Sequence, residues 1–339
     1  MNNADIRLIR CTLEDNGFRE CGPRNSEWSV MWSVSTMRSQ NLQNLSKYQK
    51  VNHFPRSYEI TRKDMLYQRI ARMLSIHGSK HFGFVPKTHV LPAEYHLLVE
   101  EMQKDKSQLW ILKPSGSSQG KGILLANQPS DIPPKQSMIA SHYISNPLLL
   151  NGYKFDLRIY VAITCINPLR IYMYKEGLGR FATAKYVEGE AQASKDNKFV
   201  HLTNYSINKF NENFQTNLDA EQDDVGSKQS LAAVRKHLRN AGIDDELIWR
   251  KIEDIVIKTL ISAEPYLNNG FEMFVPHRTN CFELLGFDIL IDNKHEPWLL
   301  EVNLSPSLNC DSPLDQKIKA ALIADLLTLC GVVPLELRM

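Results

Sequence analysis

The stretch YKFDLRIYVAIT, residues 153–164, alternates charged and apolar residues with the period of two that is typical of a β-strand. In such a strand Lys154, Asp156 and Arg158 share one face. The other face is apolar and carries Phe155, Leu157, Ile159 and Val161. The apolar face belongs in a core. The charged face has two interpretations, which are cross-strand ion pairs on an exposed sheet or a surface that meets a polyphosphate and a ribose.

A second group of polar residues lies in two apolar stretches near the end of the chain. Asp288 lies in FDILID (287–292), and Glu301 and Asn303 share one face of LLEVNL (299–304). If the two stretches form a hairpin, these three oxygen-bearing side chains converge, and Mg²⁺ binds such oxygen ligands. Isolated acids in strands usually mark exposed positions, but a carboxylate in apolar surroundings needs a partner. We therefore favour a magnesium site.

The third feature is the glycine-rich stretch KPSGSSQGKGI, residues 113–123. It is not a P-loop, because that motif requires glycine where Ser115 stands and serine or threonine where Gly122 stands. We expect a strand, a flexible flap that closes over phosphates with its backbone N–H groups, and another strand. Lys113 would supply a point charge to phosphate. By itself such a loop is more often an ordinary turn.

Strands and helices are mixed along the chain, and antiparallel hairpins are prominent, so the fold class is α+β rather than a doubly wound parallel sheet. We expect a helix over 59–76, with Thr61 as its N-cap and Gly78 after its end. The other expected elements are strands at 110–114, 121–126, 137–144 and 153–164, a hairpin over 169–186 turning at Glu176–Gly177, a mobile acidic loop at 211–230, helices at 228–240 and 244–267, and strands at 281–292 and 297–304.

Composition narrows the function further. The chain has 339 residues, 43% hydrophobic and 23% charged, with no run of about 20 apolar residues and no signal-peptide core, which favours a cytosolic protein of two or three lobes. Its net charge of +2 does not indicate a nucleic-acid binder, although residues 47–80 carry eight bases and two acids. That surplus is either a solvated helix face or a surface for an acidic partner. The six dispersed cysteines are expected to be reduced and mostly to pack in the interior.

Several motifs resemble those of the tubulin–tyrosine ligase-like enzymes, and most closely the polyglutamylases among them. The resemblance covers about residues 27–330 and rests on VNHFPRSYEITRKD (51–64), KFDLRIYV (154–161), HLTNYS (201–206), CFELLGFDILID (281–292) and WLLEVNLSPSL (298–308). It implies an ATP-grasp fold with an N-terminal lobe (1–55), a central lobe (56–144) and a C-terminal lobe (145–339), and with ATP between the last two. It also implies that ATP phosphorylates a glutamate γ-carboxylate on a tubulin tail, and that free glutamate attacks the acyl phosphate.

The resemblance assigns expected roles position by position. For ATP these residues are Lys63, Lys113, Gln119, Gly120, His142, Tyr143, Ile144, Ser145, Lys154, Phe155, Asp156, Thr203 and Asn204. Arg158, with Lys154, would neutralise the acyl-phosphate region, and Asp288, Glu301 and Asn303 would hold Mg²⁺. The incoming amino acid would meet Arg180, Tyr205, Ser206, Lys228 and Lys319.

Partners and alternatives follow from the same resemblance. The expected partners are acidic tubulin tails and free glutamate, and no nucleic acid or membrane is expected. We expect a monomer located in the cytoplasm on the microtubule cytoskeleton, including cilia and basal bodies. The sequence ends with LCGVVPLELRM (329–339), so we expect either a compact protein or a core or isoform without the basic extensions of many glutamylases. In either case residues 47–80 are left to meet an acidic tail. The alternative enzymes are a glycylase or a tyrosine ligase on the same scaffold. Charge distinguishes them from a glutamylase, because a glutamate side chain requires an extra cation in the amino-acid pocket, which Lys228 or Arg278 would supply here. A non-catalytic tubulin-binding relative should lack a metal ligand.

Overall fold

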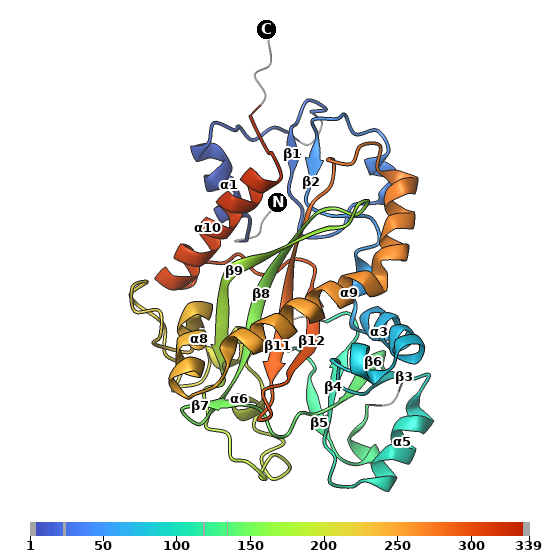
Figure 1. Ribbon diagram of the computed structural model, residues 1–339, viewed down its shortest axis with the longest axis vertical. Coiled ribbons are helices and arrows are strands. Elements are labelled where there is room, and N and C mark those ends of the chain that lie inside the picture. The colour runs from blue at the N-terminus through green and yellow to red at the C-terminus, as the bar shows by residue number, and fades with distance from the viewer. Residues whose placement is uncertain (1–4, 23–24, 118, 134, 335–339) are drawn as a thin grey trace.

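The computed structural model describes residues 5–22, 25–117, 119–133 and 135–334 (Figure 1). The described chain forms three sheets. The largest has the strand order β10-β9-β8-β11-β12, with β7 also paired to β8, the second has the order β3-β6-β4-β5, and a short parallel pair joins β1 (Val30–Met31) to β2 (Lys50–Val51). The fold is therefore mixed α/β with several sheets, as expected from the sequence.

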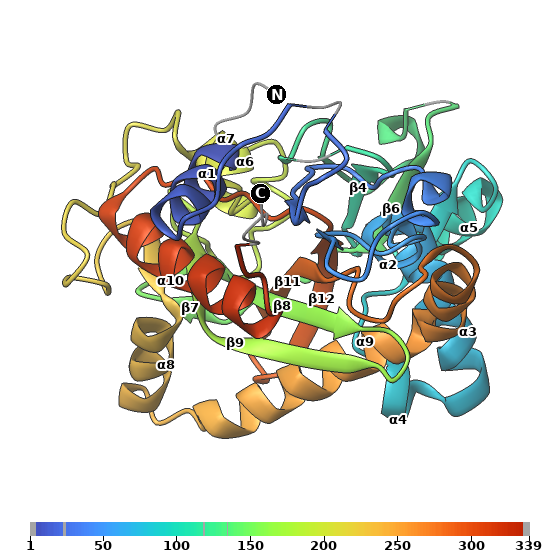
Figure 2. The ribbon, with the colours of Figure 1, turned by 90° about the horizontal axis from the view of Figure 1, so that it is seen from above.

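The large sheet is antiparallel throughout. Its strands are β7 (Leu149–Leu150), β8 (Tyr153–Cys165), β9 (Arg170–Phe181), β10 (Lys228–Ser230), β11 (Glu283–Ile291) and β12 (Pro297–Asn303). Helices α8 (Leu231–Asn240) and α9 (Asp245–Phe274) bury one face of this sheet, and α1 (Asp5–Asp15) and α10 (Pro313–Leu329) cover part of the other (Figure 2). The part of the second face that these helices leave uncovered is where the charged residues gather.

The smaller sheet lies beside the large one. It consists of β3 (Thr88–Leu91), β4 (Trp110–Pro114), β5 (Leu124–Ala126) and β6 (Met138–His142), and α5 (Tyr95–Lys104) packs on it through Leu98 and Met102. The short elements between and around the sheets are 3₁₀ turns at Ser39–Leu42 and Pro129–Asp131 and helices α2 (Tyr58–Thr61), α3 (Lys63–His77), α4 (Ser79–Phe82), α6 (Lys198–His201) and α7 (Tyr205–Asn208). The lobe boundaries expected at 55/56 and 144/145 stay predictions.

The expected hairpin at Glu176–Gly177 is wrong, because β9 is one strand that pairs with β8 along its length. The turn lies at 166–169 instead. Gly177 is required by close packing, since a Cβ there would lie 2.4 Å from the Arg158 carbonyl oxygen. A Cβ at Gly179 would likewise lie 2.5 Å from Val234 of α8. Two glycines that suggested a turn thus allow close approach of a neighbouring strand and a helix.

The expected helix over 59–76 is divided in two, and Thr61 is not an N-cap. Arg62 has extended backbone between α2 and α3 and is the N-cap of α3, while the Thr61 hydroxyl donates to the Ser57 carbonyl at 2.9 Å. Gly78 does follow the end of α3, with φ of 80°. The expected strands elsewhere are confirmed, although β5 is shorter than predicted, and the loop expected at 211–230 ends earlier because Lys228 begins β10.

The segment before α2 is joined to β11 by buried polar contacts. The Glu283 carboxylate contacts His53 Nδ1 at 2.9 Å and accepts a hydrogen bond from Ser57 Oγ at 2.6 Å.

All six cysteines are free thiols, but Cys11, Cys21 and Cys310 are exposed, so the expectation that most would pack inside is wrong.

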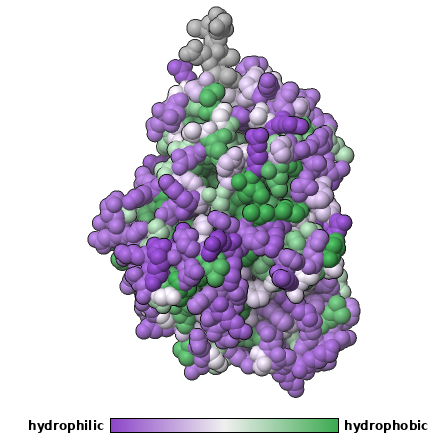
Figure 3. All heavy atoms as spheres, in the orientation of Figure 1, coloured by the Kyte–Doolittle hydropathy of each residue, from purple (hydrophilic) through white to green (hydrophobic). Residues whose placement is uncertain are grey.

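The outer surface is polar over much of the molecule. Figure 3 shows a largely hydrophilic face with a cluster of apolar side chains near the middle of the view. In the part of the chain that the structure describes, no helix combines the length and the apolar character that crossing a membrane requires.

Candidate active site

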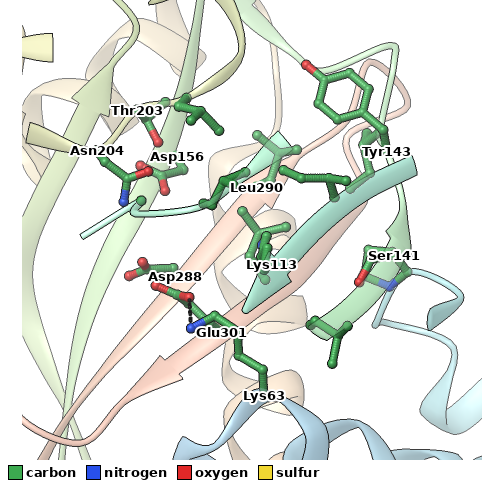
Figure 4. Close-up of a pocket in the computed structure, with 18 of the residues that line it drawn as sticks. Lys63, Lys113, Ser141, Tyr143, Asp156, Thr203, Asn204, Asp288, Leu290 and Glu301 are labelled. Atoms are coloured by element: carbon green, nitrogen blue, oxygen red, sulfur yellow. Dashed lines mark ion pairs between the residues drawn. The ribbon is translucent and has the colours of Figure 1, made fainter. Parts of the chain in front are cut away.

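A cavity separates the two larger sheets, with about 1120 Å³ of empty space that is partly open to solvent. Its walls come from both sheets, from the glycine-rich flap and from the segment 201–204 (Figure 4). The predicted residues that line it are Lys63, Lys113, Gln119, Gly120, His142, Tyr143, Ile144, Lys154, Asp156, Arg180, Thr203, Asn204, Asp288 and Glu301. Residues from distant parts of the sequence therefore meet at one site.

Strand register explains this convergence. Asp288 of β11 lies directly opposite Arg158 of β8 on one side and Glu301 of β12 on the other. Two residues before Arg158 in β8, Asp156 lies directly opposite Arg180 of β9. Directly paired residues of neighbouring strands share a face, so a band of charged side chains crosses the sheet. The shared face predicted for Asp156 and Arg158 and the hairpin predicted for Asp288 and Glu301 are confirmed.

Two arginines neutralise the buried carboxylates of this band. Asp288 is only 3% exposed and accepts from Arg158 Nε at 2.6 Å, while the guanidinium of Arg180 lies 2.8 Å away. Arg180 also pairs with Asp156 through both of its carboxylate oxygens. Burial alone would raise the pKa of Asp288, but the two guanidinium groups outweigh it and hold the pKa well below its usual range. The alternative of cross-strand ion pairs is thus correct in pairing, although these pairs are buried rather than exposed.

Asp288, Glu301 and Asn303 offer oxygen atoms to a cation, and this donor set fits Mg²⁺. Asn303 Nδ2 donates to the Gly286 carbonyl at 3.2 Å, which leaves Oδ1 as the atom that a cation would meet. The described residues contain no cluster of three or more histidine, cysteine and acidic side chains suited to a metal. Two carboxylates and one amide are nevertheless sufficient for Mg²⁺ when water and phosphate complete its coordination. Glu301 is paired with Lys63 at 3.1 Å, and both oxygens of Asp288 are paired with arginines. A cation would have to compete with Lys63 for Glu301 and with Arg158 and Arg180 for Asp288.

Two lysines reach the cavity from opposite sheets and are almost completely buried. Lys113 extends from β4 and Lys154 from β8. Burial lowers the pKa of Lys113, and the carboxylate of Glu301 opposes that shift. Burial also lowers the pKa of Lys154 to about 7, although Asp156 opposes the change. An anion that enters the cavity would favour the charged form of both lysines.

Two hydrogen bonds hold the middle of the flap over the cavity. Lys63 Nζ donates to the Ser117 carbonyl at 3.0 Å, and Ser206 Oγ donates to the Gln119 carbonyl at 2.7 Å. Gly120 has φ of 71°, and a Cβ there would lie 2.6 Å from Ile207 of α7. The glycine is therefore required both by its backbone conformation and by its contact with α7.

The residues expected to meet the amino acid form a second cluster beside the cavity. Asp315 is fully buried, and Lys228 Nζ lies 2.6 Å from one of its oxygens and Lys319 Nζ 2.7 Å from the other. The ammonium of Lys228 also lies 4.1 Å from the centre of the Tyr205 ring. Arg180 is the member of this expected set that lines the cavity, and its β9 position is directly paired with Lys228 of β10. Ser206 is held by the flap.

Two of the residues expected to meet ATP are placed differently in the structure. The expectation for Phe155 is wrong for its side chain, which points to the core, is 1% exposed and stacks on Phe181 with ring centres 5.5 Å apart. An odd position in this strand faces away from Lys154 and Asp156, as the alternation itself required. Ser145 lies outside the cavity lining, and its carbonyl accepts from the Tyr186 hydroxyl at 2.7 Å.

The basic surface expected at 47–80 is smaller than its sequence suggests. Arg69 pairs with Glu59 at 2.7 Å and stacks on Tyr266, while Lys63 belongs to the cavity. Arg62 pairs with Asp64. These bases have internal partners, so fewer are left to attract an acidic molecule.

Sequence reasoning missed several residues of the site, among them Lys121, His201 and Asp315. His201 lines the cavity and is the first residue of HLTNYS, a motif that was recognised without a role for its histidine. Asp315 follows Ser312 by three residues, a spacing that signals a helix start, and Ser312 indeed caps α10. Nothing in that signal indicates that Asp315 also binds two distant lysines.

The several sheets make this a mixed α/β protein, and the arrangement is consistent with an ATP-grasp-like fold. The chain belongs to the tubulin-tyrosine ligase family, whose sequence model matches residues 39–338.

Curated relatives show the same relationship. The chain is 48% identical over 330 residues to mouse tubulin polyglutamylase TTLL5, 42% identical over 333 residues to mouse tubulin monoglutamylase TTLL4 and 41% identical over 348 residues to the Caenorhabditis elegans tubulin polyglutamylase ttll-5. These alignments cover 97%, 98% and 99% of the chain, but only 25%, 28% and 47% of the relatives. The chain thus spans about a quarter of the length of the two mouse proteins and about half that of the worm protein.

Proposed function

We propose that this chain is an ATP-dependent ligase that adds glutamate to the γ-carboxylates of glutamates in tubulin C-terminal tails. The names of its relatives, two tubulin polyglutamylases and a tubulin monoglutamylase, support both the reaction and the acceptor. When bound, Mg-ATP would supply the phosphoryl group that converts the acceptor carboxylate to an acyl phosphate. The proposal includes three lobes, with the nucleotide between the central and C-terminal ones, and association with the microtubule cytoskeleton, cilia included.

The observation that carries the proposal is the charge and shape of the cavity. Its lining contains five lysine and arginine side chains and three carboxylates, which are Lys63, Lys113, Lys121, Lys154, Arg180, Asp156, Asp288 and Glu301. This excess of positive charge suits a polyphosphate that carries one divalent cation. The carboxylates lie together on the face of the large sheet, so the metal would bind there and the phosphates would extend toward the lysines.

The chain's own residues would act by positioning and by neutralising charge. Lys113 and Lys154 would bind phosphate or neighbouring groups of the nucleotide from the two sheets, and the flap would exclude water. Arg158, fixed by Asp288, would neutralise negative charge on the acceptor carboxylate as its oxygen becomes bonded to phosphorus. Such a reaction needs no nucleophilic side chain, because the amino group of free glutamate is the nucleophile.

The cluster of lysines beside the cavity is compatible with glutamate as the amino acid, although Lys228 and Lys319 both pair with Asp315 and a bound carboxylate would have to compete with it. Lys228 is directly paired with Arg180 across β10 and β9, so a cation lies next to the cavity on the side away from the metal ligands. A glutamate side chain has a carboxylate that glycine lacks, and an extra cation is what it requires. We propose that Lys228 and Lys319 meet the carboxylates of the incoming glutamate, together with Tyr205 and Ser206.

The proposal is tested by incubating the protein with Mg-ATP, microtubules and one radiolabelled amino acid at a time, using glutamate, glycine and tyrosine. Label should enter tubulin with glutamate, and Glu301→Gln should abolish this incorporation. Glu296→Gln is the matched control, because Glu296 is exposed and pairs with Lys251 on the surface. Incorporation of glycine or tyrosine alone would contradict the choice of amino acid. Undiminished incorporation by Glu301→Gln would contradict the metal assignment.

A further inference from the structure

Lys154 belongs to a chain of hydrogen bonds that leads away from the cavity. Its Nζ donates to the Tyr143 hydroxyl at 2.9 Å. That hydroxyl lies 2.7 Å from His201 Nδ1, and His201 Nε2 lies 3.0 Å from the Ser194 carbonyl oxygen. Lys154, Tyr143 and His201 are all buried. Three side chains and one carbonyl thus form a continuous line.

The direction of each hydrogen bond follows from the chemistry of its ends. The Ser194 carbonyl only accepts, so His201 Nε2 must carry the hydrogen. Burial, with the nearby charge of Lys154, lowers the pKa of His201 to about 4, so the ring is neutral at neutral pH and Nδ1 accepts. Burial also raises the pKa of Tyr143, whose hydroxyl keeps its proton and donates it to Nδ1. The oxygen of Tyr143 is left to accept from the Lys154 ammonium.

Aromatic contacts fix the histidine in this orientation. The His201 ring lies edge-on to Tyr143 and Tyr186, with centres 5.3 and 5.9 Å apart and interplanar angles of 79° and 89°. The ammonium of Lys154 lies 4.4 Å from the centre of the Tyr143 ring. The lysine therefore meets both the hydroxyl and the face of one tyrosine, and His201 determines which way that hydroxyl points.

We propose that His201, acting through the hydroxyl of Tyr143, is a positioning residue that directs the Lys154 ammonium into the cavity for nucleotide binding. The inference rests on the proposed function, because it takes the cavity to be the nucleotide site. In this proposal His201, although it lines the cavity, acts through Tyr143 rather than by contact with the nucleotide. It accepts the hydroxyl hydrogen of Tyr143, which turns the lone pairs of that oxygen toward Lys154 and leaves the other two N–H groups of the ammonium for the ligand.

The charged form of Lys154 sets the expected pH dependence. The groups that face it are Asp156 on its own strand, Lys113 from β4, and Tyr143, Tyr186 and His201. Asp156 favours the ammonium, whereas burial and Lys113 oppose it. With a pKa of about 7, Lys154 is charged below pH 7 and loses its proton above it. Affinity for an anionic nucleotide should therefore fall as pH rises through that range, by up to tenfold per pH unit.

Direct measurement of Mg-ATP binding by calorimetry, without acceptor or amino acid, tests the inference between pH 6.5 and pH 9. His201→Phe keeps an aromatic ring but removes the acceptor, so affinity at pH 7.5 should fall about tenfold, as for a hydrogen bond to a charged group. The midpoint of the pH dependence should also move to lower pH, because the ammonium has lost its acceptor. Tyr143→Phe should do the same. The double variant should be no worse than either, because the residues act in series.

Two further variants keep the test decisive. His201→Asn can still accept from Tyr143 through Oδ1 and should bind within about threefold of the unaltered protein. His237 is a half-buried histidine of α8, and His237→Phe is the control for the loss of an imidazole. This control should change neither the Mg-ATP affinity nor the pH midpoint. In turnover assays His201→Phe should raise KM for ATP more than it lowers kcat, as expected for lost ground-state binding.

Each outcome has one meaning. Equal affinity and an unchanged pH midpoint in His201→Phe and Tyr143→Phe, in a protein that does bind Mg-ATP, would overturn the inference but leave the proposed function intact. If His201→Phe does not fold, Tyr143→Phe and His201→Asn decide the question in the same way. If the unaltered protein binds no Mg-ATP at any pH, the proposed function fails and the inference fails with it.

Discussion

Replacing Asp288 by asparagine should destabilise the protein, because it removes a buried negative charge and leaves the shape of the side chain almost unchanged. Arg180 would keep Asp156 as its partner. Arg158 has no other carboxylate within ion-pair distance among the described residues, and its side chain is buried for the most part. Breaking a buried ion pair from one side costs roughly 3–5 kcal/mol. Asparagine can still accept one hydrogen bond, so we expect the lower end, about 3 kcal/mol.

Equilibrium unfolding in urea, followed by circular dichroism, measures this difference in the free energy of unfolding. The matched control is Asp254→Asn, which removes the same charge from an exposed pair with Lys258 on α9. That pair should contribute less than about 0.5 kcal/mol. A loss below about 1 kcal/mol for Asp288→Asn would refute the reasoning, because it would mean that Arg158 finds water or another partner without cost.

Three other substitutions test particular features. Phe155→Ala should cost about 3–5 kcal/mol in urea unfolding, because it removes a core ring, and Mg-ATP affinity of the folded fraction should not change. Gly286→Ala would place a Cβ 2.9 Å from Cβ of Pro306 and 3.1 Å from Cδ of Arg158. The overpacking should lower the free energy of unfolding by about 1–3 kcal/mol, displace Arg158 and abolish glutamate incorporation. Full incorporation would contradict the role given to Arg158. Gly120→Ala forces alanine to φ of 71° at a contact with α7. Calorimetry should show weaker Mg-ATP binding, with the binding free energy reduced by about 1–2 kcal/mol, the strain of alanine in this conformation.

The alternation of charged and apolar residues was enough to predict β8 and the face that each of its side chains would occupy. It also predicted that Asp288 and Glu301 would meet, since a short turn between two apolar runs nearly fixes their pairing. It could not identify the partner of Asp288. Arg158 is 130 positions away in sequence, and only the pairing of β8 with β11 brings the two together.

Prediction from sequence failed at three residues, for a different reason at each. Gly177 was taken as a turn residue, but the neighbouring strand leaves no room there for a side chain. Phe155 was assigned to the nucleotide by resemblance, although the strand alternation already placed its side chain on the other face. Asp315 signalled only a helix start, because its contacts with Lys228 and Lys319 depend on how α10 lies against β10.

The charged band across the large sheet also predicts how this gene region tolerates small in-frame deletions. Losing one codon between Lys154 and Arg158 would reverse every side chain on one half of β8, so that Phe155 or Leu157 would enter the cavity and a charge would enter the core. A deletion in the turn at 166–169, outside the buried Ile166, would shorten a connection between β8 and β9 without changing which faces their residues occupy. We therefore expect inherited single-codon deletions to be removed by selection between residues 154 and 158 and to be tolerated in the turn between β8 and β9.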